Sequence, residues 1–240
     1  MSFSELFLNL IYPPRCVHCD EIMSFDSLAV LCDKCKALYE REKEFECPIC
    51  RMPHYDCDCT PGRMGIEKAL HVSEYSKDKS VTRSIILYGK EKRYKRMFRM
   101  IAEDAVKVIE RHTDNFEDTV VCYVPRDPDT KNKKSFDQAE IAAHMIADIL
   151  GVDCIKAIKR KSSAKQKLLG AAERDINAKK SYEKITGRTL DIYKKRVILY
   201  DDVMTSGATV HACTSLLKQM GAKSVTVITF GRTYIDNERK

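Results

Sequence analysis

Residues 197–210, VILYDDVMTSGATV, hold the clearest structural pattern in the chain. The first four residues are aliphatic or aromatic and favour a buried β-strand. Two adjacent carboxylates, Asp201 and Asp202, end this strand and lead into a turn of small and hydroxylated residues. The turn contains Thr205, Ser206, Gly207, Ala208 and Thr209. An apolar strand, a short turn and a following helix form the repeating unit of parallel α/β sheets.

The sequence on either side shows the same alternation of strands and helices. Strand patterns cover residues 68–76, 119–125, 153–158, 195–202 and 224–230, and helix patterns cover 94–110, 136–151 and 209–221. Two of the helix patterns end at a glycine, Gly151 and Gly221, which is favoured just after a helix. We therefore predict an α/β fold over residues 63–240, with a parallel sheet and helices on both of its faces.

The two carboxylates and the turn suit different parts of one ligand. Ligands of parallel α/β sheets bind beyond the carboxyl ends of the strands, where Asp201 and Asp202 are expected. The N–H groups at the start of the next helix favour a phosphate, whereas the carboxylates would repel it and suit sugar hydroxyls or a divalent cation. A sugar phosphate meets both requirements. The turn lacks Gly-Lys-Ser/Thr and G-x-G-x-x-G, which excludes a P-loop and a Rossmann dinucleotide site.

Eight of the eleven cysteines fall into four close pairs within a short head, expected at residues 1–62. Two such pairs complete a tetrahedral zinc shell, and in a reducing compartment this spacing favours metal over disulfides. The first set is Cys16, Cys19, Cys32 and Cys35, and the second is Cys47, Cys50, Cys57 and Cys59. We predict one or two zinc ions, with His18 and His54 as alternative ligands.

The zinc could serve either of two purposes. A head of about 60 residues with few large apolar side chains needs a metal to hold it together, and it could also present a surface to nucleic acid or protein. The remaining cysteines, Cys122, Cys154 and Cys213, stand at apolar positions and are expected in the core.

Composition and charge indicate a globular chain. Its 240 residues are 44% hydrophobic and 32% charged, which excludes a disordered protein, and the net charge of +7 suits an anionic ligand.

The N-terminal segment lacks the basic start of a signal peptide, and Pro13 and Pro14 end its apolar stretch. We expect a short amphipathic helix there. No stretch reaches the roughly 20 apolar residues of a membrane span, so we expect a cytoplasmic protein.

The segment at 197–209 resembles the phosphoribosyl pyrophosphate motif of type I phosphoribosyltransferases. A cysteine-paired head before such a domain is similar to the ComF/GntX family, competence-associated proteins required for natural transformation in bacteria. In that family Gly-Phe-Asn-Gln begins ten residues after the proline of a Val-Pro strand end, and here SFDQ begins ten residues after Pro125, with Ser135 and Asp137 replacing glycine and asparagine. Further matches, in a stretch that is mobile in the family, are Arg160, Gln166, Leu169, Arg174, Asn177 and Tyr182.

The resemblance covers nearly the whole chain and implies phosphoribosyl pyrophosphate with Mg²⁺ as the ligand, whose phosphoribosyl group the protein transfers or senses. Displacement at the anomeric carbon passes through an oxocarbenium-like state, which the charges of Asp201 and Asp202 would favour. The leaving pyrophosphate needs cations, and Arg126 directly follows the strand end. Residues 156–167 hold six basic residues, including Arg160 and Lys165, and no acid. They form either a lid over the diphosphate or a solvated basic loop.

A non-catalytic factor that binds single-stranded DNA or competence proteins is the alternative. Residues 90–99 carry six basic residues interleaved with Tyr94 and Phe98, and cationic grooves with stacking aromatics suit single strands. The same pattern also fits the basic face of an amphipathic helix. Asp201 and Asp202, with their phosphate-binding turn, distinguish the two functions, because DNA binding does not need them.

Overall fold

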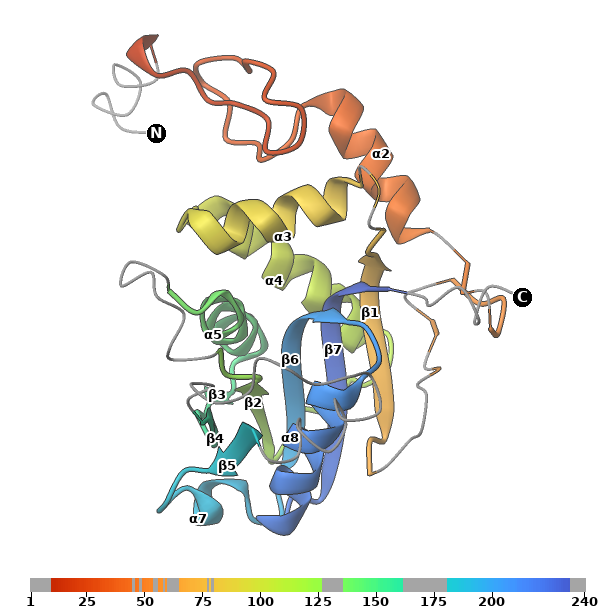
Figure 1. The fold of residues 1–240 in the computed structure, drawn as a ribbon, viewed down its shortest axis with the longest axis vertical. Coiled ribbons are helices and arrows are strands. Elements are labelled where there is room, and N and C mark those ends of the chain that lie inside the picture. The colour runs from red at the N-terminus through yellow and green to blue at the C-terminus, as the bar shows by residue number, and fades with distance from the viewer. Residues whose placement is uncertain are drawn as a thin grey trace, which may run out of the picture.

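The computed structural model describes residues 10–44, 46–47, 49–53, 56–57, 59, 65–76, 78, 80–126, 136–161 and 181–233. Its centre is a five-stranded sheet in which all paired neighbours are parallel, in the order β1-β7-β6-β2-β3. The strands are β1 (Lys68–Glu74), β2 (Thr119–Tyr123), β3 (Asp153–Cys154), β6 (Arg196–Met204) and β7 (Ser224–Arg232). Figure 1 shows the sheet with helices around it.

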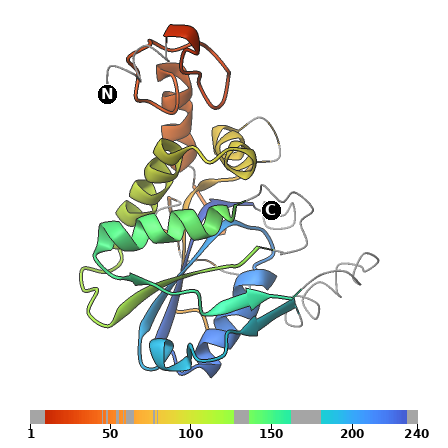
Figure 2. The same cartoon turned by 90° about the vertical axis from the view of Figure 1, so that its left-hand side faces the viewer.

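Helices cover both faces of this sheet, as predicted (Figures 1 and 2). One face carries α3 (Val81–Glu91), α4 (Lys95–Glu110) and α5 (Gln138–Leu150), and the other carries α8 (Ala208–Gln219). A hydrophobic core lies on each face of the sheet, and alternate residues of β6 belong to one or the other. Ile198 and Tyr200 pack with α3, α4 and α5, whereas Val197 and Leu199 pack with α8. Both faces of the strand are therefore buried, which explains its continuous apolar sequence.

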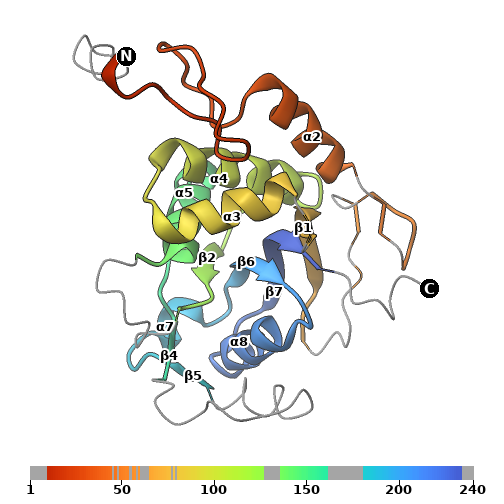
Figure 3. The same cartoon turned by 45° about the horizontal axis from the view of Figure 1, so that its top comes forward.

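The cysteine-rich head packs on the large domain and shares its core. Its helix α2 (Asp33–Lys43) starts directly after Cys32 and lies beside α3 (Figure 3). Tyr39 of α2 is 2% exposed, packs 6.1 Å from the ring of Phe230 and donates to Asp104 Oδ2 of α4 at 2.9 Å. Burial raises the pKa of Tyr39, so this hydroxyl stays protonated and remains a donor.

Glu42 of the head closes the first turn of α3, a helix of the large domain. Its carboxylate oxygens accept the backbone N–H groups of Val81 and Thr82 at 2.7 and 2.8 Å, and also the Thr82 hydroxyl at 2.8 Å. Free N–H groups and the positive end of the helix dipole make this position favourable for a carboxylate. His18 adds a hydrogen bond of 2.9 Å to Ser84 on the same helix. Four hydrogen bonds thus tie the head to α3.

The structure differs from the sequence prediction in three places. The predicted strand at 153–158 is wrong, because β3 ends at Cys154 and Ile158–Arg160 forms β4, which pairs antiparallel with β5 (Tyr182–Lys184) in a separate hairpin. The strand expected to end at Asp202 continues to Met204, since β7 still pairs with it there. Helices α2 and α3 and the four-residue helix α7 (Thr189–Ile192) were not predicted.

Several predicted positions lie outside the described residues. These are the boundary between residues 62 and 63, most of the N-terminal helix, His54, Ser135, and the stretch that holds Lys165, Gln166, Leu169, Arg174 and Asn177. Of the other cysteines, Cys122 and Cys213 are buried and Cys154 is half-buried. Within the described ranges, every helix is too short or too polar to cross a membrane.

Candidate functional site

A cavity of about 300 Å³ opens where β2 stops and β6 continues. Five of the predicted phosphoribosyl-site residues meet here, namely Arg126, Arg160, Asp201, Asp202 and Thr209. The lining consists of Lys90, Val124, Pro125, Arg126, Asp137, Gln138, Ala139, Arg160, Tyr182, Asp201, Asp202, Val203 and Thr209. Tyr123 and Tyr200 form the last pair between β2 and β6, so the next residues of β6 have no β2 neighbour and can face a ligand.

The two aspartates have different surroundings, because successive residues of a strand point to opposite faces. Asp202 is half-buried, accepts a short hydrogen bond from Gln138 Nε2 of α5 and lies 3.7 Å from Lys90 Nζ of α3. Asp201 is buried and accepts the backbone N–H of Asp202 at 2.9 Å. Burial, and secondarily the charge of Asp202, raise the pKa of Asp201 well above its ordinary value. This carboxyl therefore favours a hydrogen-bonded hydroxyl or a cation beside it.

The turn after β6 has the backbone that an anion site needs. Gly207 has a φ of +78°, a left-handed conformation that favours glycine, and it is the N-cap of α8. Gly207 has no side chain to cap this helix, and the Ser206 hydroxyl accepts the N–H of Ala208 only in a long hydrogen bond of 3.4 Å. The start of α8 therefore still suits an anion. Thr209 lines the cavity, whereas Thr205, Ser206, Gly207 and Ala208 form the adjoining turn rather than the lining. The predicted phosphate site is thus next to the aspartates.

Three cations face the carboxylates across the cavity. Arg126 and Arg160 were predicted there, and Lys90 was missed, although it belongs to the basic stretch at 90–99. The Arg160 guanidinium lies 5.6 Å from the ring centre of Tyr182, which fixes it by a cation–π contact. Burial raises the pKa of Tyr182 to about 12, so its hydroxyl is protonated at neutral pH.

Asp137 and Gln138 hold this edge of the site together, and their role was not predicted. Asp137 caps α5 by accepting the backbone N–H of Ala139 at 3.0 Å, and its other oxygen accepts the backbone N–H of Arg126 at 2.9 Å. An aspartate just before a helical pattern is a recognisable N-cap. Its second contact joins the start of α5 to the end of β2 and positions Arg126 at the cavity.

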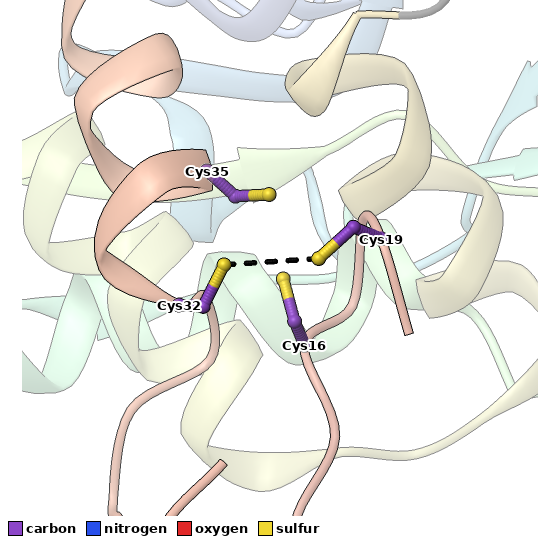
Figure 4. A group of neighbouring side chains, drawn as sticks. All are labelled: Cys16, Cys19, Cys32 and Cys35. Carbon is purple, nitrogen blue, oxygen red and sulfur yellow. Dashed lines mark hydrogen bonds between the residues drawn. The ribbon is translucent and has the colours of Figure 1, made fainter. Parts of the chain in front are cut away.

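The eight head cysteines form the two predicted groups. In each group the four sulfur atoms lie within 4.8 Å of one another. In the first group, drawn in Figure 4, Cys32 and Cys35 lie at the start of α2 and face Cys16 and Cys19 on the preceding loop. The sulfur atoms of Cys19 and Cys32 are 3.7 Å apart. Four thiolates about 2.3 Å from one tetrahedral zinc ion would be about 3.8 Å apart, so this geometry fits zinc.

The chain has recognisable similarity to known proteins. Residues 138–238 match the family model described as phosphoribosyl transferase domain. The chain is 21% identical to competence protein ComFC of Streptococcus pneumoniae (strain ATCC BAA-255 / R6), over 91% of this chain and 100% of that protein.

Among solved structures, a hypoxanthine-guanine phosphoribosyltransferase of Bacillus anthracis has 14% identity and a TM-score of 0.39, over 61% of this chain and 74% of that one. A phosphoribosylpyrophosphate synthetase of Mycobacterium smegmatis has 21% identity and a TM-score of 0.35, over 55% of this chain. The chain spans about a third of that synthetase.

The fold, the strand-turn-helix site and the domain match define a protein with a type I phosphoribosyltransferase domain. The similarity to ComFC extends over nearly the whole chain, including the part that precedes the matched domain. The chain thus combines a cysteine-rich head with a phosphoribosyltransferase-like domain, and it is similar to a competence protein over nearly its whole length.

Proposed function

We propose that the protein binds phosphoribosyl pyrophosphate with Mg²⁺ and transfers or senses its phosphoribosyl group, in association with DNA uptake. The main support is the cavity in which Asp201, Asp202 and Thr209, from one strand-turn-helix segment, face three cationic side chains. The link to DNA uptake comes from the similarity to a competence protein.

Each part of the ligand has a matching group in this proposal. The turn at 205–209 binds the 5′-phosphate through backbone N–H groups and hydroxyls, and Asp201 and Asp202 bind the ribose hydroxyls. Lys90, Arg126 and Arg160 face the pyrophosphate, and we also assign to it Lys165 and Arg174, which lie outside the described residues. During displacement, the two carboxylates stabilise positive charge that develops at the anomeric carbon.

The carboxylate oxygens of Asp201 and Asp202 are also the ligand type that Mg²⁺ prefers. Bound together with the ligand, the ion would neutralise charge on the leaving diphosphate. Lys90 already lies near Asp202, so the side of the cavity next to α3 carries cationic charge before any metal arrives.

Calorimetry with phosphoribosyl pyrophosphate, with and without Mg²⁺, tests the proposal. We expect saturable binding that requires Mg²⁺, since the diphosphate and the 5′-phosphate together carry more negative charge than three side chains balance. Pyrophosphate release, measured over a panel of nucleobases and amines, then separates transfer from sensing. No binding by the unmodified protein would contradict both.

We further propose that each cysteine group binds one zinc ion. The supporting observation is the clustering of four sulfur atoms in both groups. His18 is not needed as a ligand in the first group, because four thiolates are present and its Nδ1 is engaged with Ser84.

One observation favours weak binding of single-stranded DNA as a second function. The first turn of α4 carries Lys95 and Arg96 and no acidic residue, and Lys92 and Arg93 just before it are exposed. Cations at a helix N-terminus oppose the helix dipole, and a phosphate backbone would relieve this repulsion. The expected stacking by Phe98 is wrong, since this ring is 1% exposed and packs in the core.

Titration of a labelled oligonucleotide at two salt concentrations tests the DNA-binding function. Binding that rests on a few phosphate contacts should weaken at least tenfold between about 50 and 200 mM salt, because counterion release drives it. A Lys92→Gln/Arg93→Gln variant should bind less tightly, and Lys184→Gln/Arg188→Gln, two exposed cations away from this helix, serves as the matched control. Absent binding at low salt, or an affinity that ignores salt, would exclude this function.

A further inference from the structure

A buried arginine joins the second cysteine group to the central sheet. Arg232 is the last residue of β7 and is 1% exposed. Its Nη1 donates to the backbone carbonyl oxygen of Cys59 in a short hydrogen bond and lies 3.9 Å from the sulfur of Cys57. Both cysteines belong to the group within which all four sulfur atoms lie close together. The guanidinium is therefore placed directly beside two residues of this group.

The charge of the arginine is complementary to a metal centre of this kind. Four thiolates around one Zn²⁺ carry a net charge of about −2. A guanidinium is always protonated, and an ion of this kind is buried at low cost only beside opposite charge. Donation to the sulfur of Cys57 and to the carbonyl of Cys59 is the type of outer contact that orients metal ligands.

The same nitrogen of the arginine is also held by the sheet, through His71 and Thr229. Its Nη1 lies 3.1 Å from His71 Nε2 on β1, and His71 Nδ1 lies 2.8 Å from the hydroxyl of Thr229 on β7. Because a guanidinium can only donate, His71 Nε2 must accept. The proton of the neutral imidazole is then on Nδ1 and points to the Thr229 oxygen. His71 and Thr229 are both fully buried, so this alignment is rigid.

We propose that Arg232 is a positioning residue of the second cysteine centre, held in place by His71 and Thr229, so that the sheet controls how tightly this centre retains its metal. The inference rests on the proposal that Cys47, Cys50, Cys57 and Cys59 bind zinc. It assigns a role to three buried residues of the large domain, outside the phosphoribosyl site.

The test is the rate at which each centre of the full-length protein releases zinc to a chromogenic chelator. A Cys57→Ser/Cys59→Ser variant gives the release curve of the first centre alone, and subtraction gives the second. In Arg232→Gln we expect release from the second centre to accelerate by about 10- to 100-fold, the usual effect of losing an outer contact, with the first centre unchanged. Arg188→Gln, an exposed arginine paired with Asp191, is the matched control and should release zinc at the unmodified rates.

Two milder variants keep the test decisive if Arg232→Gln does not fold. Arg232→Lys keeps the charge but loses the planar fork, and Thr229→Val keeps the shape but removes the oxygen that His71 faces. Both should speed release from the second centre only, and replacement of zinc by Co²⁺ should show a changed absorption band. Equal acceleration at both centres, or none in folded variants, would overturn the inference. One zinc ion in the unmodified protein would instead refute the second zinc site itself.

Discussion

Replacement of both Asp201 and Asp202 by asparagine is expected to abolish measurable binding of phosphoribosyl pyrophosphate and to leave the fold intact. Asparagine keeps the shape, and its oxygen can still accept the backbone N–H that Asp201 accepts from Asp202. The charges are lost, and each charged hydrogen bond is worth about 1.5–3 kcal/mol. Two such losses weaken binding by about 10²- to 10⁴-fold. The fold should tolerate the change, because the substitution preserves the volume of both side chains and this hydrogen bond within the strand.

Calorimetry with Mg²⁺ present measures this effect, and thermal unfolding verifies the fold. Asp191→Asn, the same substitution on an exposed aspartate of α7, should bind like the unmodified protein. An affinity within twofold of the unmodified protein would show that the carboxylates do not contact the ligand.

The other half of the site can be tested separately through Gly207. Gly207→Val should also prevent binding of plain ribose 5-phosphate, because a branched side chain blocks the approach of the phosphate to the backbone. Gly207 has a left-handed φ, so any side chain there adds strain. Gly187→Val is the matched control, since Gly187 has a similar φ of +88° and nothing within 4 Å of an added Cβ. If both variants bind ribose 5-phosphate equally, the turn is not the phosphate site.

Removal of zinc is expected to lower the melting temperature of the whole chain by at least about 10 °C. Cys16 and Cys35 are buried in the same core as Tyr39 and Phe230, so the first centre is part of the main packing. Structural zinc contributes roughly 10–16 kcal/mol of binding free energy in small domains, which rivals the stability of an entire domain. Without metal, the four close thiols of the first group would separate and disturb α2.

Elemental analysis followed by thermal unfolding in a chelator tests this prediction. We expect two zinc ions per chain, and Cys154→Ser should keep both, since Cys154 lies outside the two groups. A single zinc ion would remove Cys57 and Cys59 from the ligand set, and none would refute the zinc sites altogether. Unchanged melting after zinc removal would show that the head does not stabilise the large domain.

The parts of the structure that local sequence determines were predictable. The apolar strand, the two aspartates and the glycine turn follow one another within residues 197–209, and each cysteine pair is separated by one or two residues. Their geometry depends on neighbours in the chain, so spacing alone indicates the sheet and both cysteine groups. The same holds for the helices that end near Gly151 and Gly221.

The features that depend on distant contacts were not predictable. Lys90 lies in the site because helix α3 packs close to Asp202, a residue more than a hundred positions further along the chain. Helix α3 itself is rich in β-branched residues and contains Gly89, which resembles a strand more than a helix. A Cβ at Gly89 would lie 2.9 Å from the ends of the Gln138 and Met97 side chains, so both side chains would have to move. The β4–β5 hairpin also pairs residues that are far apart, such as Ile158 and Lys184.

The carboxylate of Glu42 has a consequence for how this protein can be divided. A fragment that starts at residue 63 would keep every strand of the sheet but would lose the acceptor for the first N–H groups of α3. It would also expose Phe230 where Tyr39 now covers it. Helix α3 positions Lys90 at the cavity. Truncation would therefore impair ligand binding, although every residue of the cavity lining would still be present. A graft of either part onto another protein therefore requires both.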